Sequence, residues 1–160
     1  MSCVSTIDHQ ARLDVRELLS RYCQYIDHNQ GAAFAELFTH DAVFELSDGT
    51  RLTSMDEFRL IPGMVWEMGG GKWRHQITNV VIDRGVTYRE VTVTATGLVL
   101  DWNRGGAMAS CYDYRIEVCR SHAWRIRKFY GGEVGSNVDT GPCHAWMNPP
   151  PKTLADVRMI

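Results

Sequence analysis

The apolar residues of this chain change their spacing part-way along the sequence. Up to about residue 60 they recur every three or four positions, which is the period of one buried face of an α-helix. After the glycines at 69–71 they alternate with polar residues, which is the period of a β-strand. Helices followed by consecutive strands are typical of an α+β domain, so we expect helices packed against one sheet.

The first part of the chain predicts three helices. The first covers residues 8–29 and carries one apolar stripe, which consists of Ala11, Val15, Leu18, Leu19, Tyr22 and Ile26. The second covers residues 32–38. Ser54 and Glu57 have the spacing of a capping box, which begins the third helix, and Pro62 with Gly63 is expected to end or kink it.

The later part predicts long strands joined by short turns, which form an antiparallel meander. Together with a short strand nearer the start of the chain, the expected strands cover residues 42–46, 73–81, 90–102, 107–119 and 124–130. On the first long strand, one face is predicted to hold Trp73, His75, Ile77, Asn79 and Val81. A twisted sheet wrapped around a few helices makes a cone with an open mouth.

Length, charge and motifs exclude several classes of protein. The 160 residues suit one domain, and the scattered basic residues and net charge of -2 argue against a nucleic-acid partner. No apolar run approaches the roughly 20 residues that a membrane span needs. The five cysteines form no C-x-x-C pair and the first residues lack an apolar signal segment, which favours a cytoplasmic protein with reduced thiols.

Cofactor motifs are missing from the sequence. The six histidines have no zinc-like spacing, and no cysteine pair supports them. There is no Gly-rich dinucleotide fingerprint, no P-loop and no G-x-S-x-G elbow. We therefore expect neither a metal nor a cofactor.

His75 is the first candidate for chemistry. Neighbouring strand residues point to opposite faces, and His75 shares its face with the apolar Trp73 and Ile77, so it is expected to face inward. An inward histidine needs a partner for one of its ring nitrogens. That partner is either a backbone carbonyl, in which case His75 is a core residue, or a functional side chain.

Asp27 is the candidate for that functional partner. It lies near the C-terminal end of the first helix, where the helix dipole disfavours a carboxylate, and it adjoins the apolar stripe at Ile26. One interpretation is a solvated turn residue without a role. The other is a carboxylate that holds His75 in one tautomer and stabilises its charged form, as in hydrolytic triads.

Tyrosines and arginines supply further candidates. Tyr22 belongs to the helical stripe and lies five residues before Asp27, while Tyr112 and Tyr114 share one face of a strand. A tyrosine in a pocket can donate to a developing oxyanion, although many are only core residues. Arg125 and Arg127 alternate with apolar residues on the last strand, and either one of them reaches the cavity or both are solvated.

Three separated segments resemble one known family. Residues 18–22 with Asp27, residues 37–44 and residues 74–83, followed by Trp124-Arg125-Ile126, resemble the SnoaL-like branch of the NTF2-like superfamily. The resemblance covers residues 7–131. It implies an α+β cone in which N-terminal helices pack inside a curved antiparallel sheet that encloses a cavity.

The resemblance also implies site residues. The pattern of Tyr22, Asp27 and His75 is similar to that of scytalone dehydratase, bile-acid dehydratase and lindane dehydrochlorinase. In those enzymes a His–Asp pair removes a proton while a leaving group departs. By resemblance His75 is the base, Asp27 its orienter and Tyr22 an acid or oxyanion donor, while Arg127 is the nearest candidate for the cation that some members use.

These observations lead to one expected function and three alternatives. We expect a cofactor-independent lyase or isomerase, dehydratase-like, acting on a medium-sized, largely apolar small molecule that Tyr112, Tyr114, Arg127, Trp73 and Trp146 help to bind. The fold also occurs in polyketide-type cyclases, in ligand-binding proteins and in the non-catalytic β subunit of ring-hydroxylating dioxygenases.

Two expectations concern the whole chain. Residues 1–140 should form the domain, and residues 141–160 should form an extended, proline-containing tail that covers the cavity mouth with Trp146. The protein should form a homo-oligomer, a trimer or a dimer. Three short helices cannot cover both sheet faces, and one side of a single strand carries Thr92, Thr94, Thr96, Leu98, Leu100 and Trp102.

Overall fold

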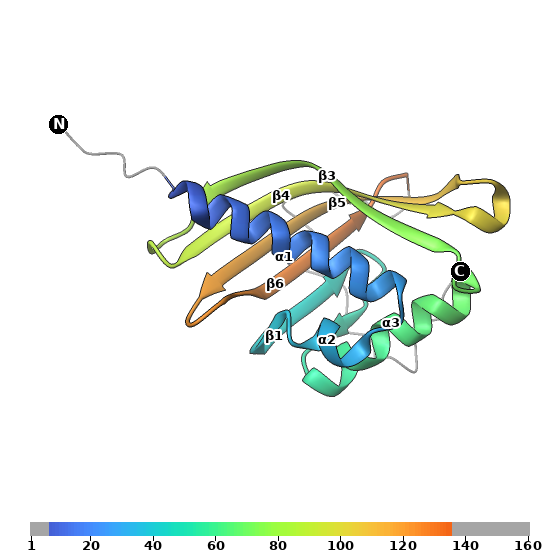
Figure 1. Ribbon diagram of the computed structural model, residues 1–160, viewed down its shortest axis with the longest axis horizontal. Helices are drawn as coiled ribbons and strands as arrows, with labels where there is room; N and C mark the ends of the chain where they lie inside the picture. Colours follow the sequence, from blue (N-terminus) through green and yellow to red (C-terminus); the bar gives the residue numbers. More distant parts are fainter. Residues whose placement is uncertain (1–6, 136–160) are drawn as a thin grey trace.

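The computed structural model describes residues 7–135, which form an open, curved sheet with helices packed on it (Figure 1). The elements in chain order are α1 (His9–Asp27), α2 (Gly31–Ala35), β1 (Phe38–Leu46), β2 (Arg51–Leu52), α3 (Met55–Gly69), β3 (Trp73–Arg84), β4 (Glu90–Asp101), the 3₁₀ turn η1 (Trp102–Arg104), β5 (Ala107–Arg120) and β6 (Trp124–Glu133). The expected α+β cone is confirmed. The predicted tail at 141–160, with Trp146, lies outside the described residues.

The described sheet has the strand order β2-β1-β6-β5-β4-β3. Strands β3 to β6 form the expected antiparallel meander. Strand β1 pairs with β6, the last strand of this meander. The two strands run parallel, with Phe44 opposite Phe129. The sheet is therefore mixed, because β1 and β6 are far apart in sequence and no short turn dictates their relative direction.

Helix α1 lies across the concave side of the sheet and buries the whole predicted stripe, from Ala11 to Ile26. Its first turn is capped by Asp8, whose side chain accepts from the backbone N–H of Gln10. It ends at Asp27, and Asn29 adopts a left-handed conformation with φ 54°. Asparagine tolerates this conformation better than most residues, so the end of α1 is fixed locally.

An aromatic core holds α1 against the strands. The ring of Phe129 on β6 stacks on Tyr22 of α1 and on Phe44 of β1, with centroid distances of 5.1 and 4.8 Å. Phe38 stacks on Phe58 of α3 at 4.7 Å. Burial of each such ring contributes roughly 1.5–3 kcal/mol, so these contacts fix both helices relative to the sheet.

Helix α3 differs from the sequence prediction. The capping box is present, since Ser54 accepts from the Glu57 backbone and the Glu57 side chain accepts from the Ser54 backbone. Pro62 does not end the helix, which continues to Gly69 with Pro62 buried inside it. The helix ends at its C-cap residue Gly70, which adopts a left-handed conformation with φ 56°.

Strand β3 contains a bulge that the sequence did not reveal. Asn79 has φ 52°, and the pairing with β4 shifts between Thr78 and Val81. One extra residue reverses which side chains face inward beyond that point. The prediction that Val81 faces inward is therefore wrong: it is 52% exposed, and Ile82 is buried instead.

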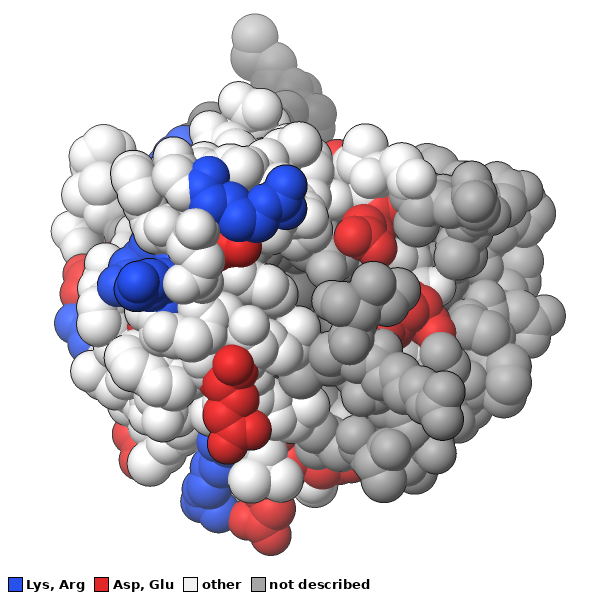
Figure 2. Space-filling model, turned by 90° about the vertical axis from the view of Figure 1, so that its right-hand side faces the viewer, with Lys and Arg blue, Asp and Glu red and all other residues white. Residues whose placement is uncertain are grey.

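Two surface properties bear on partners. Within the described part of the chain, no helix is long and apolar enough to cross a membrane. The described part of the face in Figure 2 carries scattered acidic and basic side chains with no continuous area of one sign.

Candidate active site

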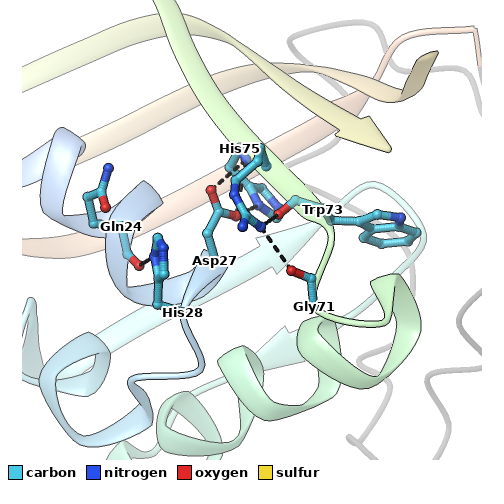
Figure 3. Close-up of polar contacts among 7 residues, drawn as sticks. Gln24, Asp27, His28, Gly71, Trp73 and His75 are labelled. Atoms are coloured by element: carbon cyan, nitrogen blue, oxygen red, sulfur yellow. Dashed lines mark hydrogen bonds and ion pairs between the residues drawn. The ribbon is translucent and has the colours of Figure 1, made fainter. Parts of the chain in front are cut away.

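The structure brings Asp27 and His75 together from elements 48 residues apart in sequence (Figure 3). The carboxylate Oδ1 of Asp27 lies 2.6 Å from Nδ1 of His75. The backbone N–H of His75 also donates to the same carboxylate, at 3.1 Å to Oδ1 and 2.9 Å to Oδ2. Asp27 thus fixes both the ring and the backbone of His75.

These contacts indicate which tautomer a neutral His75 ring adopts. An ionised carboxylate only accepts hydrogen bonds, so Nδ1 of His75 carries a proton and Nε2 of the neutral ring is left as an acceptor. The side chains are 6% and 11% exposed for Asp27 and His75. The N–H donors offset the cost of burying the Asp27 charge at the C-terminal end of α1, where the helix dipole is unfavourable.

His28 provides a contrast within the same turn. Its Nδ1 lies 2.8 Å from the carbonyl oxygen of Gln24 on the exposed side of α1, and Figure 3 shows the ring turned away from the pair. A histidine at the end of α1 is therefore not sufficient for contact with Asp27. The contact depends on where β3 passes the helix end.

His75 forms part of the wall of a cavity of about 150 Å³ between the helices and the sheet. Most of the wall is apolar and comes from α1, α3 and the strands, with Trp73 among its aromatic members. Its polar members are Tyr22, Thr50, His75, Ser110, Tyr112 and Tyr114. No Arg, Lys, Asp or Glu occurs among the described wall residues, so the cavity suits an uncharged molecule.

The three tyrosines predicted from the sequence all line this cavity with His75. Burial raises the pKa of Tyr22 well above its usual value, and burial likewise raises the pKa of Tyr114. Burial also raises the pKa of Tyr112, although a hydrogen bond with Ser110 opposes this shift. The phenols therefore stay protonated at neutral pH and act as hydrogen-bond donors rather than as bases.

Gly97 positions Tyr114, and sequence reasoning missed it. A Cβ added to Gly97 would lie 2.1 Å from Cε2 of Tyr114 and 2.5 Å from its hydroxyl oxygen. The phenol can therefore lie against Gly97 of β4 only because residue 97 has no side chain. The available signal was a glycine inside a strand rich in Val and Thr, which often marks a close approach.

Helix α3 supplies part of the wall that sequence reasoning also missed. Its contributing side chains have helical spacing and are Ile61, Met64, Val65 and Met68. This pattern is visible in the sequence. A helix that ended at Pro62 would break this pattern directly after Ile61.

The prediction that Arg127 reaches the cavity is wrong. Its Nη1 lies 2.6 Å from Oε1 of Glu90 and its Nη2 3.4 Å from Oε2 of Glu117, on the outer side of the sheet. The inner side of β6 belongs to its neighbour Ile126, which is fully buried. Strand alternation thus places Arg127 outside. Among residues 7–135 there is also no cluster of His, Cys, Asp or Glu that could hold a metal ion.

Comparison with known proteins identifies the family. Residues 8–130 match the SnoaL-like domain family, and the chain belongs to it. A search of curated proteins finds no match. Solved structures with the same NTF2-like fold agree with this assignment.

Three of these structures illustrate the likeness. An NTF2-like protein with a cystatin-like fold from Novosphingobium aromaticivorans is similar over 93% of this chain and 99% of its own, with a TM-score of 0.73 and 14% identity. LinA is similar over 78% of this chain and 86% of its own, with a TM-score of 0.64 and 17% identity. A candidate scytalone dehydratase from N. aromaticivorans is similar over 78% of this chain and 85% of its own, with a TM-score of 0.62 and 15% identity. At these identities the likeness concerns the fold.

Proposed function

We propose that the protein is a cofactor-independent lyase or isomerase in which His75 is the general base and Asp27 its positioning residue. The observation that carries this proposal is the 2.6 Å contact between Asp27 and Nδ1 of His75 at the wall of an uncharged cavity. It leaves Nε2 as the atom that accepts a proton from the substrate.

The reaction follows from this arrangement. His75 Nε2 takes a proton from a carbon that a neighbouring carbonyl acidifies, and the C–H electrons form a new C=C bond. As the carbonyl re-forms, the electron pair of this enolate either expels a leaving group from the β-carbon, which takes the proton from the His75 imidazolium, or accepts that proton at another carbon. Asp27 stabilises the imidazolium that forms, and such a base contributes about 10²–10⁴-fold to the rate.

The protonated tyrosines support the same chemistry. Negative charge that develops on the substrate's carbonyl oxygen needs a donor, and Tyr22 and Tyr114 line the same cavity as His75. The apolar wall lowers the local dielectric and strengthens such hydrogen bonds. Similarity to a candidate scytalone dehydratase favours elimination as the first reaction to test.

The test compares turnover of neutral cyclic ketones that carry a β-hydroxyl or an allylic double bond, with products followed by NMR. His75→Ala should lower turnover by at least about 100-fold. Asp27→Asn should also lower it severely, because an amide nitrogen cannot accept the N–H groups that Asp27 binds. The control is His28→Ala, which removes an exposed histidine one residue from Asp27 and should retain full activity.

Other results would contradict the proposed mechanism or favour an alternative function. Full turnover in His75→Ala would remove His75 from the mechanism. Tight binding of a ligand that is recovered unchanged would favour a ligand-binding protein, and a ring-closed product would favour a cyclase. Co-purification with a larger oxygenase subunit would favour the β-subunit alternative.

A further inference from the structure

Trp73 forms part of the cavity wall where the cavity meets the surface. Tyr22 and Tyr114 line the same cavity and are buried, whereas Trp73 is half-buried and Met68 of α3 is 36% exposed. A side chain that lines a cavity and is also in contact with solvent lies at the border between the two. Trp73 and Met68 therefore mark the solvent-facing end of the cavity.

Gly69, the last residue of α3, fixes the position of the Trp73 ring. A Cβ added to Gly69 would lie 2.4 Å from Cγ and 2.8 Å from Cδ1 of Trp73, so the indole lies directly on the helix backbone. Figure 3 shows Trp73 on the part of β3 nearest to α3. The indole is carried by β3 and packed on α3, which restricts its rotation and makes it a fixed part of the wall.

The spacing along β3 gives the room between Trp73 and the candidate base. Trp73 and His75 lie two residues apart before the bulge at Asn79, and their β4 partners are Asp101 and Val99. Two residues of a strand span about 6.4–6.8 Å. A molecule whose reacting carbon lies at His75 therefore has room for about one six-membered ring in the direction of Trp73.

The size and charge of the cavity lead to the same limit. A cavity of about 150 Å³ holds one benzene-sized ring, as an engineered apolar cavity of that volume does. The described wall offers no fixed charge that would compensate a carboxylate, phosphate or ammonium group. A second ring fused to the first would need the space that the Trp73 indole fills.

We propose that Trp73 is a specificity-determining residue that restricts the substrate to an uncharged molecule with a single ring. The indole excludes a second fused ring by occupying its place at the solvent-facing end of the cavity. The statement that His75 deprotonates a carbon of the bound ring rests on the proposed function, whereas the size limit does not.

The test uses ¹⁹F NMR titrations at pH 7 with two neutral probes that differ by one fused ring, 4-fluorophenol and 6-fluoro-2-naphthol. The variants are Trp73→Ala, which removes the indole, and Trp73→Phe, which replaces its two rings by one. The matched control is Trp66→Ala. Trp66 is also packed on a glycine, since a Cβ added to Gly71 would lie 2.7 Å from its Cζ2, but it is not among the described wall residues.

Wild-type protein should bind 4-fluorophenol more tightly than 6-fluoro-2-naphthol, although the naphthol offers more apolar surface. Trp73→Ala should bind the naphthol at least about tenfold more tightly than wild type does, because each buried carbon of the second ring adds to the affinity. Trp73→Phe should give an intermediate affinity, and Trp66→Ala should bind both probes as wild type does. Melting temperatures show which variants fold, and Trp73→Phe decides the question if Trp73→Ala does not.

The proposal is overturned if wild-type protein binds the naphthol as tightly as the Trp73 variants that fold. An equal gain in Trp66→Ala, or no binding of 4-fluorophenol to wild type, would also overturn it. Repeating the titrations in His75→Ala separates this proposal from the proposed function. If His75 is not the base, turnover persists in His75→Ala, while the preference for one ring and its dependence on Trp73 remain.

Discussion

Adding a methyl group to Gly97 should displace the Tyr114 phenol from the cavity wall. The added Cβ would lie 2.1 and 2.2 Å from Cε2 and Cζ of Tyr114, far inside the distance that carbon atoms tolerate. The ring cannot slide toward the other side, because Gly131 flanks it there and Phe129 packs on it with a centroid distance of 4.8 Å. Either the ring leaves its site or the strands separate.

The expected cost follows from two opposing effects. Overpacking of a core position costs about 1–3 kcal/mol. Replacing glycine by alanine in a strand recovers about 0.5–1 kcal/mol, because the unfolded chain loses conformational freedom. We therefore expect Gly97→Ala to lower the free energy of unfolding by up to about 2.5 kcal/mol in equilibrium urea titrations, and turnover to fall because the Tyr114 hydroxyl has moved.

Two matched variants isolate the cause. Gly63→Ala lies inside α3, where an added Cβ meets only Asn29 Oδ1 at 3.4 Å, so it should stabilise by up to about 1 kcal/mol. In a Tyr114→Ala background the methyl group of Gly97→Ala has room and should be neutral or stabilising. An equal cost of Gly97→Ala with and without the Tyr114 ring would refute the reasoning.

Three other outcomes are expected. Burial raises the pKa of Tyr22 and Tyr114 above 10, so the unfolded chain releases these protons before the folded protein does as the pH rises. The free energy of unfolding should therefore fall above about pH 10, by up to about 1.4 kcal/mol per pH unit for each phenol. In urea titrations Tyr22→Phe should make this fall less steep. Deleting the chain after Thr140 should weaken substrate binding without unfolding the domain, and unchanged kinetics would defeat the proposed cover. Light scattering at micromolar concentration should show a dimer or trimer. A monomer would contradict the expected interface on the sheet face that carries Thr92, Thr94, Thr96, Leu98 and Leu100 of β4; Trp102, expected on the same strand, lies in η1 instead.

The contact between Asp27 and His75 was predictable because each residue's position has a local cause. The helical stripe places Asp27 beside its buried face, and strand alternation turns His75 inward next to Trp73. Neither pattern states that the helix end meets β3. That step came from the resemblance to SnoaL-like proteins, which supplied the three-dimensional arrangement.

The features that sequence reasoning missed depend on tertiary contacts. The bulge at Asn79 reverses the later part of β3 without any glycine or proline to mark it. Arg127 was a candidate only because the register of the last strand was open, and its carboxylate partners come from β4 and β5.

The most direct test of His75 as a base is the exchange of carbon-bound hydrogen for deuterium. Neutral cyclic ketones that bind in the cavity are incubated in D₂O with the protein, and deuterium incorporation beside the carbonyl is followed by NMR. This measurement requires proton abstraction alone and no leaving group. Wild-type protein and His28→Ala should catalyse the exchange, and His75→Ala should be slower by at least about 100-fold. Equal exchange rates in wild type and His75→Ala, or no catalysed exchange of any ketone that binds, would contradict the account.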